Sequence, residues 1–194
     1  MTRINHLTIL ALSSALALAG CGSGSKGSSS AEPGDSGAEK VGSAPAGWNA
    51  ADACSVLDKA KVGDSLKVAV PQTQLGMVHE AGAADAATSE CTYLGEDGSS
   101  VARLMTRWSP VADNSAEAIA TTKSSAAAAI KAFSDKPLED VPDLGKAAFF
   151  VPAGLPSLTV FLDDARMVTV TIEKVPDGAN GKDLAIALAK QAGA

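Results

Sequence analysis

The stretch ECTYLGEDGSSVARLMTRW, residues 90–108, is the clearest indication of fold in this chain of 194 residues. Two β-rich segments, 90–94 and 100–108, flank an Asp-Gly pair, which predicts a hairpin. In the second segment, successive side chains would point to opposite faces of a sheet. One face would carry the mainly apolar set Ala102, Leu104, Thr106 and Trp108, and the other would carry Val101, Arg103, Met105 and Arg107, which include two arginines. This alternation predicts an antiparallel sheet covered on one side only.

Further strands are predicted on both sides of this hairpin. Segments 147–151, 157–162 and 166–172 are candidates, and Asp163-Asp164 predicts a short turn between the last two. Those two alternate with inward apolar residues: Leu158, Val160, Leu162, Val168, Val170 and Ile172. Before the hairpin, 66–70 is β-like, and a weak strand around Met77 is followed by a loop.

Three helices are expected around these strands. Asn49 and Asp52 fit a capping pair for a helix that carries Cys54 and stops near Gly63, and Asp58 suits the cap of a second short turn. Segment 114–133 is the strongest helix. It has Asn114 and Glu117 as a capping box and one apolar stripe of Ile119, Ala126, Ile130 and Phe133. Asn180 and Asp183 are expected to cap a terminal helix containing Leu184 and Leu188.

The order of these elements is typical of the α+β class. We expect an antiparallel sheet of about 5–6 strands with the helices packed on one face, forming a single domain over residues 48–194. The chain contains seven aromatic residues, so its core must be built from Ala, Val, Leu and Ile.

The N-terminus has the pattern of an export signal. Arg3 is the only charge among the first six residues, and Leu7–Leu18 is almost wholly apolar. That run is shorter than the roughly 20 residues needed to cross a bilayer. Leu18-Ala19-Gly20-Cys21 resembles the lipobox of bacterial lipoproteins at every position. The resemblance implies a cleaved signal over residues 1–20 and fatty acyl chains, such as palmitate, on Cys21. A buried helix with an incidental cysteine is the alternative.

The segment after Cys21 is predicted to be a disordered tether. Twenty of the 26 residues in 22–47 are Gly, Ser, Ala or Pro, a composition that cannot bury enough apolar surface to offset the ordering entropy. As a flexible coil, this segment spans about 28 Å. Residues 21–47 would therefore connect the lipid to the domain, and Trp48 would mark the start of folded structure, with its ring packed on the domain.

The remaining cysteines are Cys54 and Cys91. An even pair in an exported protein is typical of a disulfide, and closing this loop would contribute about 4 kcal/mol. Two buried thiols or a metal pair are the alternatives. No nearby histidine or CxxC spacing supports a metal site.

Three short motifs resemble a family of uncharacterised bacterial lipoproteins. The motifs are Cys54-Ser55-Val56-Leu57, Cys91-Thr92-Tyr93 and the segment VPDLGKAAF over 141–149. Members typically show a Cys-Ser-Leu-Leu helix start, a Cys followed two residues later by Trp or Tyr, and a turn of the form VPGLGDxA. Asp143 and Lys146 depart from the commoner Gly and Asp of that turn. The resemblance covers most of 50–192 and implies an exported, disulfide-stapled α+β domain, with no catalytic residues to transfer.

Few residues indicate a catalytic or metal-binding site. His79 is the only histidine after the signal, and no GxSxG motif exists, so a surface histidine is expected. Glu139, Asp140 and Asp143 lack the order of a calcium loop, which predicts a solvated acidic loop. Removing residues 1–20 changes the formal charge from −6 to −7 because Arg3 is lost. With no basic cluster, nucleic acid is not an expected partner, and no cofactor or metal is expected.

Three hypotheses of function remain. The first is a non-catalytic binding module of the cell envelope, anchored through Cys21 and using a sheet face or the loop at 71–89 to contact an envelope protein. The second is a carrier of a small apolar ligand held between the sheet and the 114–133 helix. The third, a hydrolase with an unrecognised site, is the least favoured. Gly22 after the lipidated cysteine suits the periplasmic side of an outer membrane, if the source has two membranes.

Overall fold

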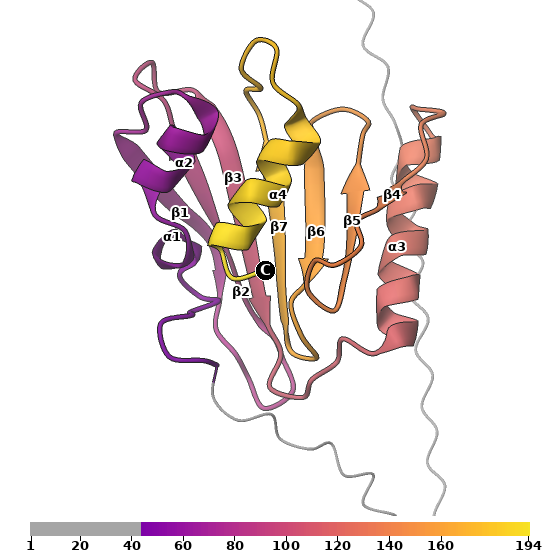
Figure 1. Cartoon of the computed structure of the whole chain (residues 1–194). Helices are drawn as coiled ribbons and strands as arrows, with labels where there is room; N and C mark the ends of the chain where they lie inside the picture. Colours follow the sequence, from indigo (N-terminus) through magenta and orange to yellow (C-terminus); the bar gives the residue numbers. More distant parts are fainter. Residues whose placement is uncertain (1–43) are drawn as a thin grey trace, which may run out of the picture. The chain divides into compact units, whose positions relative to one another are not determined.

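The computed structural model describes residues 44–194, which form four helices and one antiparallel sheet of seven strands (Figure 1). The predicted signal, Cys21 and most of the predicted tether lie outside the described residues. The α+β class and the antiparallel arrangement are confirmed, with more strands than expected. Within the described part, no helix is long and apolar enough to cross a membrane.

The order of the strands in the sheet is β1-β2-β3-β7-β6-β5-β4, so β1 and β4 form its two edges. The strands are β1 Gln72–His79, β2 Ala87–Leu94, β3 Ser100–Trp108, β4 Glu139–Asp140, β5 Ala147–Val151, β6 Ser157–Phe161 and β7 Arg166–Ile172. The weak strand around Met77 is β1, a full eight-residue strand paired with β2. The predicted hairpins join β2 to β3 and β6 to β7.

The predicted strand over 66–70 is wrong. The helix expected to stop near Gly63 is instead two helices, α1 Ala53–Val56 and α2 Lys59–Leu66, so Leu66 ends a helix. Asp58 caps α2, because its Oδ1 accepts a hydrogen bond from the Ala60 amide at 2.8 Å. A Cβ at Gly63 would lie 2.8 Å from the Val68 carbonyl oxygen, so this glycine permits a close return of the chain rather than a helix stop.

The other two helices are α3 Ala116–Lys131 and α4 Gly181–Gln191. Asn180 caps α4, as predicted, by accepting a hydrogen bond from the Lys182 amide at 2.9 Å. The cap of α3 is Ser115 rather than Asn114: the Ser115 hydroxyl accepts from the Ala118 amide at 3.1 Å. The Asn114 side chain is buried and instead donates to the backbone carbonyls of Asp163 and Arg166.

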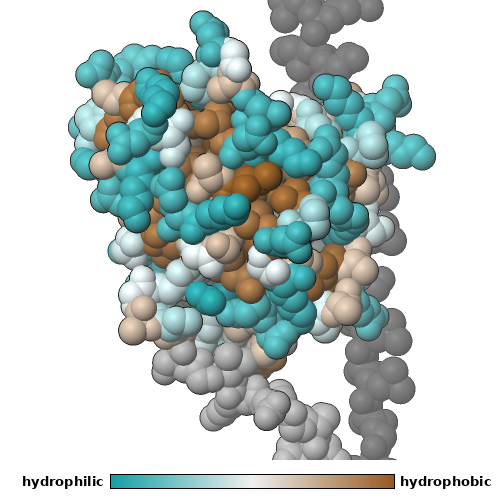
Figure 2. All heavy atoms as spheres, in the orientation of Figure 1, coloured by the Kyte–Doolittle hydropathy of each residue, from teal (hydrophilic) through white to brown (hydrophobic). Residues whose placement is uncertain are grey.

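Helices α1, α2 and α4 cover one face of the sheet, and α4 crosses in front of β7 in Figure 1. We call this the helix-covered face. The largest fully buried side chains lie between these helices and the strands: Leu57, Val62, Leu66, Tyr93, Leu104, Leu158, Val160, Val168, Val170, Ile172 and Leu188. On the outside of this face, hydrophilic residues dominate, and hydrophobic ones show through between the elements (Figure 2). The predicted alternation of inward and outward side chains along the central strands is therefore confirmed.

Helix α3 does not share this face, so the prediction that the helices pack on one face holds for α1, α2 and α4 and is wrong for α3. It lies against the opposite face, where Ala118 and Thr122 border a hollow that Phe161 and Met167 also line. Phe161 and Met167 are cross-strand partners that alternate with the core residues of β6 and β7. Of the predicted α3 stripe only Ile130 is buried, and Phe133 is 68% exposed. An alanine-rich helix offers little apolar area, so tertiary packing of α3 is slight.

Trp48 closes the core beside the C-terminal helix. Its Nε1 donates to the Ala192 carbonyl at 3.3 Å, and the Arg166 guanidinium lies 5.5 Å from the ring centroid. The predicted packing of this ring on the domain is confirmed.

Candidate functional site

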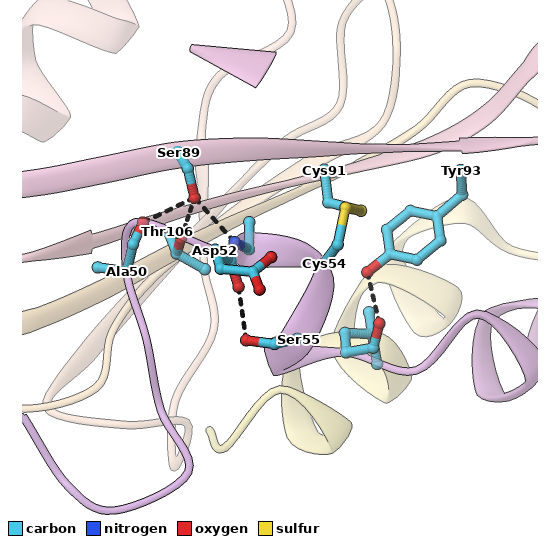
Figure 3. Close-up of a disulfide and its surroundings, with 10 residues drawn as sticks. Ala50, Asp52, Cys54, Ser55, Ser89, Cys91, Tyr93 and Thr106 are labelled. Atoms are coloured by element: carbon cyan, nitrogen blue, oxygen red, sulfur yellow. Dashed lines mark hydrogen bonds between the residues drawn. A yellow bond between two sulfur atoms is a disulfide. The ribbon is translucent and has the colours of Figure 1, made fainter. Parts of the chain in front are cut away.

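The Cys54–Cys91 disulfide is present and joins α1 to β2 (Figure 3). Cys91 is fully buried and Cys54 is half-buried. The bridge is therefore part of the core, as the sequence predicted. Cys21, the predicted site of lipid attachment, lies outside the described residues.

Hydrogen bonds around the bridge hold the first helix to the sheet. The buried Ser89 hydroxyl accepts from the Ala53 amide at 2.8 Å and donates to the Ala50 carbonyl at 2.7 Å, while Thr106 donates to the same carbonyl at 2.9 Å (Figure 3). Because the Ser89 and Thr106 hydroxyls are buried and satisfied, they form a structural cluster with no group left over for chemistry.

Tyr93 extends this cluster along β2. Its hydroxyl donates to the Leu57 carbonyl at 2.7 Å, and its ring is fully buried (Figure 3). Burial, and secondly the nearby charge of Asp58, raise the pKa of Tyr93 well above its usual value. The side chain is thus a neutral donor in the folded protein and serves to position α1.

The acidic residues named from the sequence are held by ion pairs and turns. Glu139 and Asp140 form β4 rather than a loop; Glu139 pairs with Lys182 at 2.7 Å, and Asp140 pairs with Lys123. Asp143 adopts a left-handed conformation with φ of 59°. Within residues 44–194, no group of three His, Cys, Asp or Glu side chains is placed to hold a metal ion.

Asp163-Asp164 forms the predicted turn between β6 and β7, and Asp163 shapes it. Burial acts to raise the pKa of Asp163, but hydrogen bonds from the Ala165 amide and from the backbone and side chain of Arg166 outweigh it, so the pKa is lowered. Lys146 pairs with Asp164 and donates to the Asn114 carbonyl at 2.7 Å. This polar network joins the start of α3 to the sheet and is structural.

The hollow between α3 and the sheet has a volume of about 230 Å³. Phe161, Met167 and Ala118 give it an apolar part, and the paired Arg107 and Asp113 border its other side. Ligand pockets for drug-sized molecules usually have about 300–1,000 Å³. The hollow is therefore small for a carrier site, although it lies at the place where the sequence predicted one.

The outer side of β1 differs from all these regions. We call the free side of Gln72–His79 the β1 edge; within residues 44–194, β1 pairs only with β2. Three large or β-branched apolar side chains around its bulge are exposed: Leu75 by 42%, Met77 by 75% and Val78 by 51%. An edge strand presents unpaired backbone groups, and exposed apolar side chains beside them favour pairing with another strand.

The β1 edge carries no Lys, Arg, Asp or Glu over its eight residues. His79 lies exposed at its end, as the sequence predicted for a surface histidine. The regular pairing with β2 spans Gln72–Gly76; the register then shifts at a bulge in which Met77 has φ of 50°. The edge therefore has a regular half and a bulged, apolar half.

Sequence reasoning placed a weak strand and a loop here and missed the exposed edge. The signal that could have found the strand is the alternation of Gln72 and Gln74 with Thr73 and Leu75 directly after Pro71. Its position at the sheet edge depends on the strand order, which has no local signal.

No protein-family model, no curated protein and no solved structure matches this chain. The β1 edge is therefore a candidate contact surface on the basis of its geometry alone.

Proposed function

We propose that this chain is a lipid-anchored lipoprotein of the bacterial envelope whose domain is a non-catalytic interaction module, and that the β1 edge is its contact surface. The observation that carries the proposal is the exposure of Leu75, Met77 and Val78 on an uncharged edge strand. Such an edge accepts an extended strand from a partner through backbone hydrogen bonds, and the adjacent apolar side chains add contact area.

The rest of the described domain supports a binding role over catalysis. The buried hydroxyls of Ser89, Thr106 and Tyr93 are bonded to backbone groups, and His79 lies on the surface at the end of an edge strand. A nucleophile needs a base within hydrogen-bond reach. No hydrogen bond joins His79 to a serine, threonine or cysteine in residues 44–194.

The membrane part of the proposal rests on Leu18-Ala19-Gly20-Cys21 and on the tether composition. Two or more acyl chains on Cys21 would anchor the protein stably, since each buried methylene contributes about 0.8 kcal/mol. We expect the wild-type protein to partition into the detergent phase of Triton X-114 and Cys21→Ser to lose this behaviour. A wild-type protein in the aqueous phase would contradict the anchor.

The contact surface is tested by site-specific photo-crosslinking in the native envelope. A photoreactive amino acid replaces Val78 on the β1 edge or, as the matched control, Leu155, which is exposed by a similar 46%. We expect protein adducts from position 78 and few from position 155. Equal labelling at both positions would contradict the β1 edge as a contact surface.

The second candidate function is carriage of a small apolar ligand, which the hollow between α3 and the sheet favours. A photoreactive group at Thr122, beside Phe161 and Met167, would then capture lipid rather than protein. Lipid adducts at position 122, with no protein adducts at position 78, would favour the carrier over the interaction module.

A further inference from the structure

Two side chains of opposite charge, Lys59 and Glu80, lie beside the two ends of β1. At its start, the exposed Lys59 donates a hydrogen bond from Nζ to the Pro71 carbonyl, and α2 with its cap residues, 58–67, carries three lysines and two aspartates. At its end, Glu80 and Asp85 lie in the connection to β2. From Gln72 to Ala102 the sequence has no Lys or Arg. Glu96 and Asp97 of the turn between β2 and β3 also lie near the start of β1, because Gln72 pairs with Leu94. The charge difference between the two ends of this uncharged strand is therefore carried by single side chains, Lys59 beside Pro71 and Glu80 directly after His79.

We propose that the partner of the β1 edge is the β1 edge of a second copy of this chain, paired antiparallel about a two-fold axis. The inference rests on the proposed contact function and names its partner. Antiparallel pairing places the start of one β1 opposite the end of the other, so Lys59 of each copy faces Glu80 of its partner. The two-fold axis repeats this complementary contact twice.

The uncharged strand also suits self-pairing. Like charges placed directly opposite each other destabilise a sheet, and a strand without charge avoids this cost when it meets itself. Without residues 1–20 each copy has a formal net charge of −7, so two copies approach with least repulsion at an uncharged strand flanked by Lys59 and Glu80. The exposed side chains of Leu75 and Met77 then lie near their counterparts in the partner.

The topology limits this association to two copies. When β1 edges pair, the joined sheet ends in β4 on both sides. Each β4 has only two residues, Glu139 and Asp140, and both are in ion pairs. Short, charged edges resist further strand pairing. We therefore expect a closed dimer rather than a filament.

The first test reverses charges in the full acylated protein, purified in detergent micelles, and measures the monomer–dimer equilibrium by sedimentation. Lys59→Glu and Glu80→Lys alone are each expected to raise the dimer dissociation constant by about tenfold, because each creates two repulsive contacts per dimer. The double variant, with the pair exchanged, is expected to return to within about threefold of wild type. Lys136→Glu, an exposed reversal after α3, is the control and should leave the constant unchanged.

Lys59→Glu removes the exposed hydrogen bond from Lys59 to the Pro71 carbonyl, and its effect on folding is expected to be small. Lys59 is the first residue of α2, where an acidic side chain is favourable, and Glu80 is exposed outside the strands. Circular dichroism and thermal midpoints of all variants should match the wild type. A wild-type protein that stays monomeric at the highest concentration reached, or a double variant that associates no better than the single ones, would overturn the dimer.

The second test determines the direction of pairing. Single cysteines replace Gln74, Gly76 or Val78, and pairs of variants are mixed before treatment with a short bismaleimide. A Cβ at Gly76 would meet no heavy atom within 4 Å, so that substitution is accommodated. Antiparallel pairing predicts that a cysteine near the centre of the contact links to the same position in the second copy. Away from the centre, two positions should link only when their residue numbers add up to twice the number of that central position. Self-linking at every position would indicate parallel pairing and contradict the proposal.

The adducts from position 78 in the envelope separate this inference from the proposed function. An adduct with twice the mass of the chain, whose peptides all come from this sequence, supports the second copy. Adducts with another protein alone would overturn the inference and leave the contact function standing. The absence of any protein adduct at position 78 would contradict both the dimer and the proposed contact function.

Discussion

The two edges of the sheet differ in length, charge and covering. β1 has eight residues without a charge and exposes Leu75, Met77 and Val78, whereas β4 has two residues, both acidic. Lys182 of α4 and Lys123 of α3 pair with the acids of β4. Charged, very short edge strands are a common protection against sheet-to-sheet association. Only the β4 edge has this protection.

The β1 edge is instead supported from the inside. Its neighbour β2 carries Cys91, Ser89 and Tyr93, which attach α1 and the chain before it through the disulfide and buried hydrogen bonds. An edge that is paired on its inner side with an anchored strand and free on its outer side is preorganised to accept another strand, since less order is lost on binding. Under the proposed function, β4 therefore serves folding and β1 serves contact.

The largest expected effect comes from removing this internal support. Replacing Cys54 and Cys91 by Ser should lower the free energy of unfolding by about 4 kcal/mol on the chain-entropy model, since the bridge closes a loop of 37 residues. Hydrogen exchange should accelerate more in 72–94 than in 147–161. A uniform acceleration over both segments would contradict the special support of β1.

Tyr93 gives the next effect, which depends on pH. Because burial and then Asp58 raise the pKa of Tyr93, the folded protein keeps the phenolic proton at a pH where the unfolded chain loses it. The free energy of unfolding should therefore fall as the pH rises above about 10, the ordinary tyrosine value.

Tyr93→Phe isolates this contribution. The variant leaves the Leu57 carbonyl without its donor and should lose about 1–3 kcal/mol at pH 8. Urea unfolding of both proteins at pH 8 and pH 10.5 is the measurement, and the gap between them should narrow at the higher pH. A gap that is constant with pH would show that Tyr93 does not cause the alkaline loss.

Local patterns predicted the regular parts of this fold. The alternation in 157–172, the Asp163-Asp164 turn, the Asn180 cap and the Cys54–Cys91 bridge depend on residues close in sequence or on simple cysteine counting, and all are confirmed. The strands and caps can be recognised from the local sequence, because backbone geometry requires a two-residue period in a strand and a polar side chain at the start of a helix.

The predictions that failed concern features that depend on residues distant in the sequence. Gly63 is required by the approach of the Val68 carbonyl, and Asn114 leaves the capping position because the turn between β6 and β7 offers it two carbonyls. Phe133 fits a helical stripe but lies outside the helix and is exposed. The β1 edge belongs to the same group, since only the complete strand order shows which strand has a free side.

A smaller effect is expected at the protected edge. Lys123 and Asp140 are exposed, so Lys123→Ala should change the free energy of unfolding by less than about 1 kcal/mol. Repeating the denaturant titration in high salt should remove most of the difference, because salt screens exposed pairs. A loss of several kcal/mol would mean that this pair is needed to hold α3 and that β4 is more than a protected edge.

The smallest effect on folding is expected at Met77, the most exposed of the apolar side chains on β1. Met77→Asn removes that side chain and keeps a residue type that tolerates φ of 50°, so the free energy of unfolding should stay within about 0.5 kcal/mol of wild type. Met77→Val is the control for the backbone: a β-branched residue strains this conformation and should cost about 1 kcal/mol.

Urea unfolding and sedimentation of both variants then separate two reasons for an exposed apolar residue. If Met77→Asn is neutral in folding and weakens association, the side chain contributes to the contact at the β1 edge and not to the core. If Met77→Asn instead destabilises the monomer by as much as a buried substitution, about 2 kcal/mol or more, the bulge packs inward and the contrast between the two edges fails. The comparison of Val78 with Leu155 extends the same reasoning from stability to contact, because both are similarly exposed apolar residues but only Val78 lies in the edge strand, while Leu155 lies in the loop between β5 and β6.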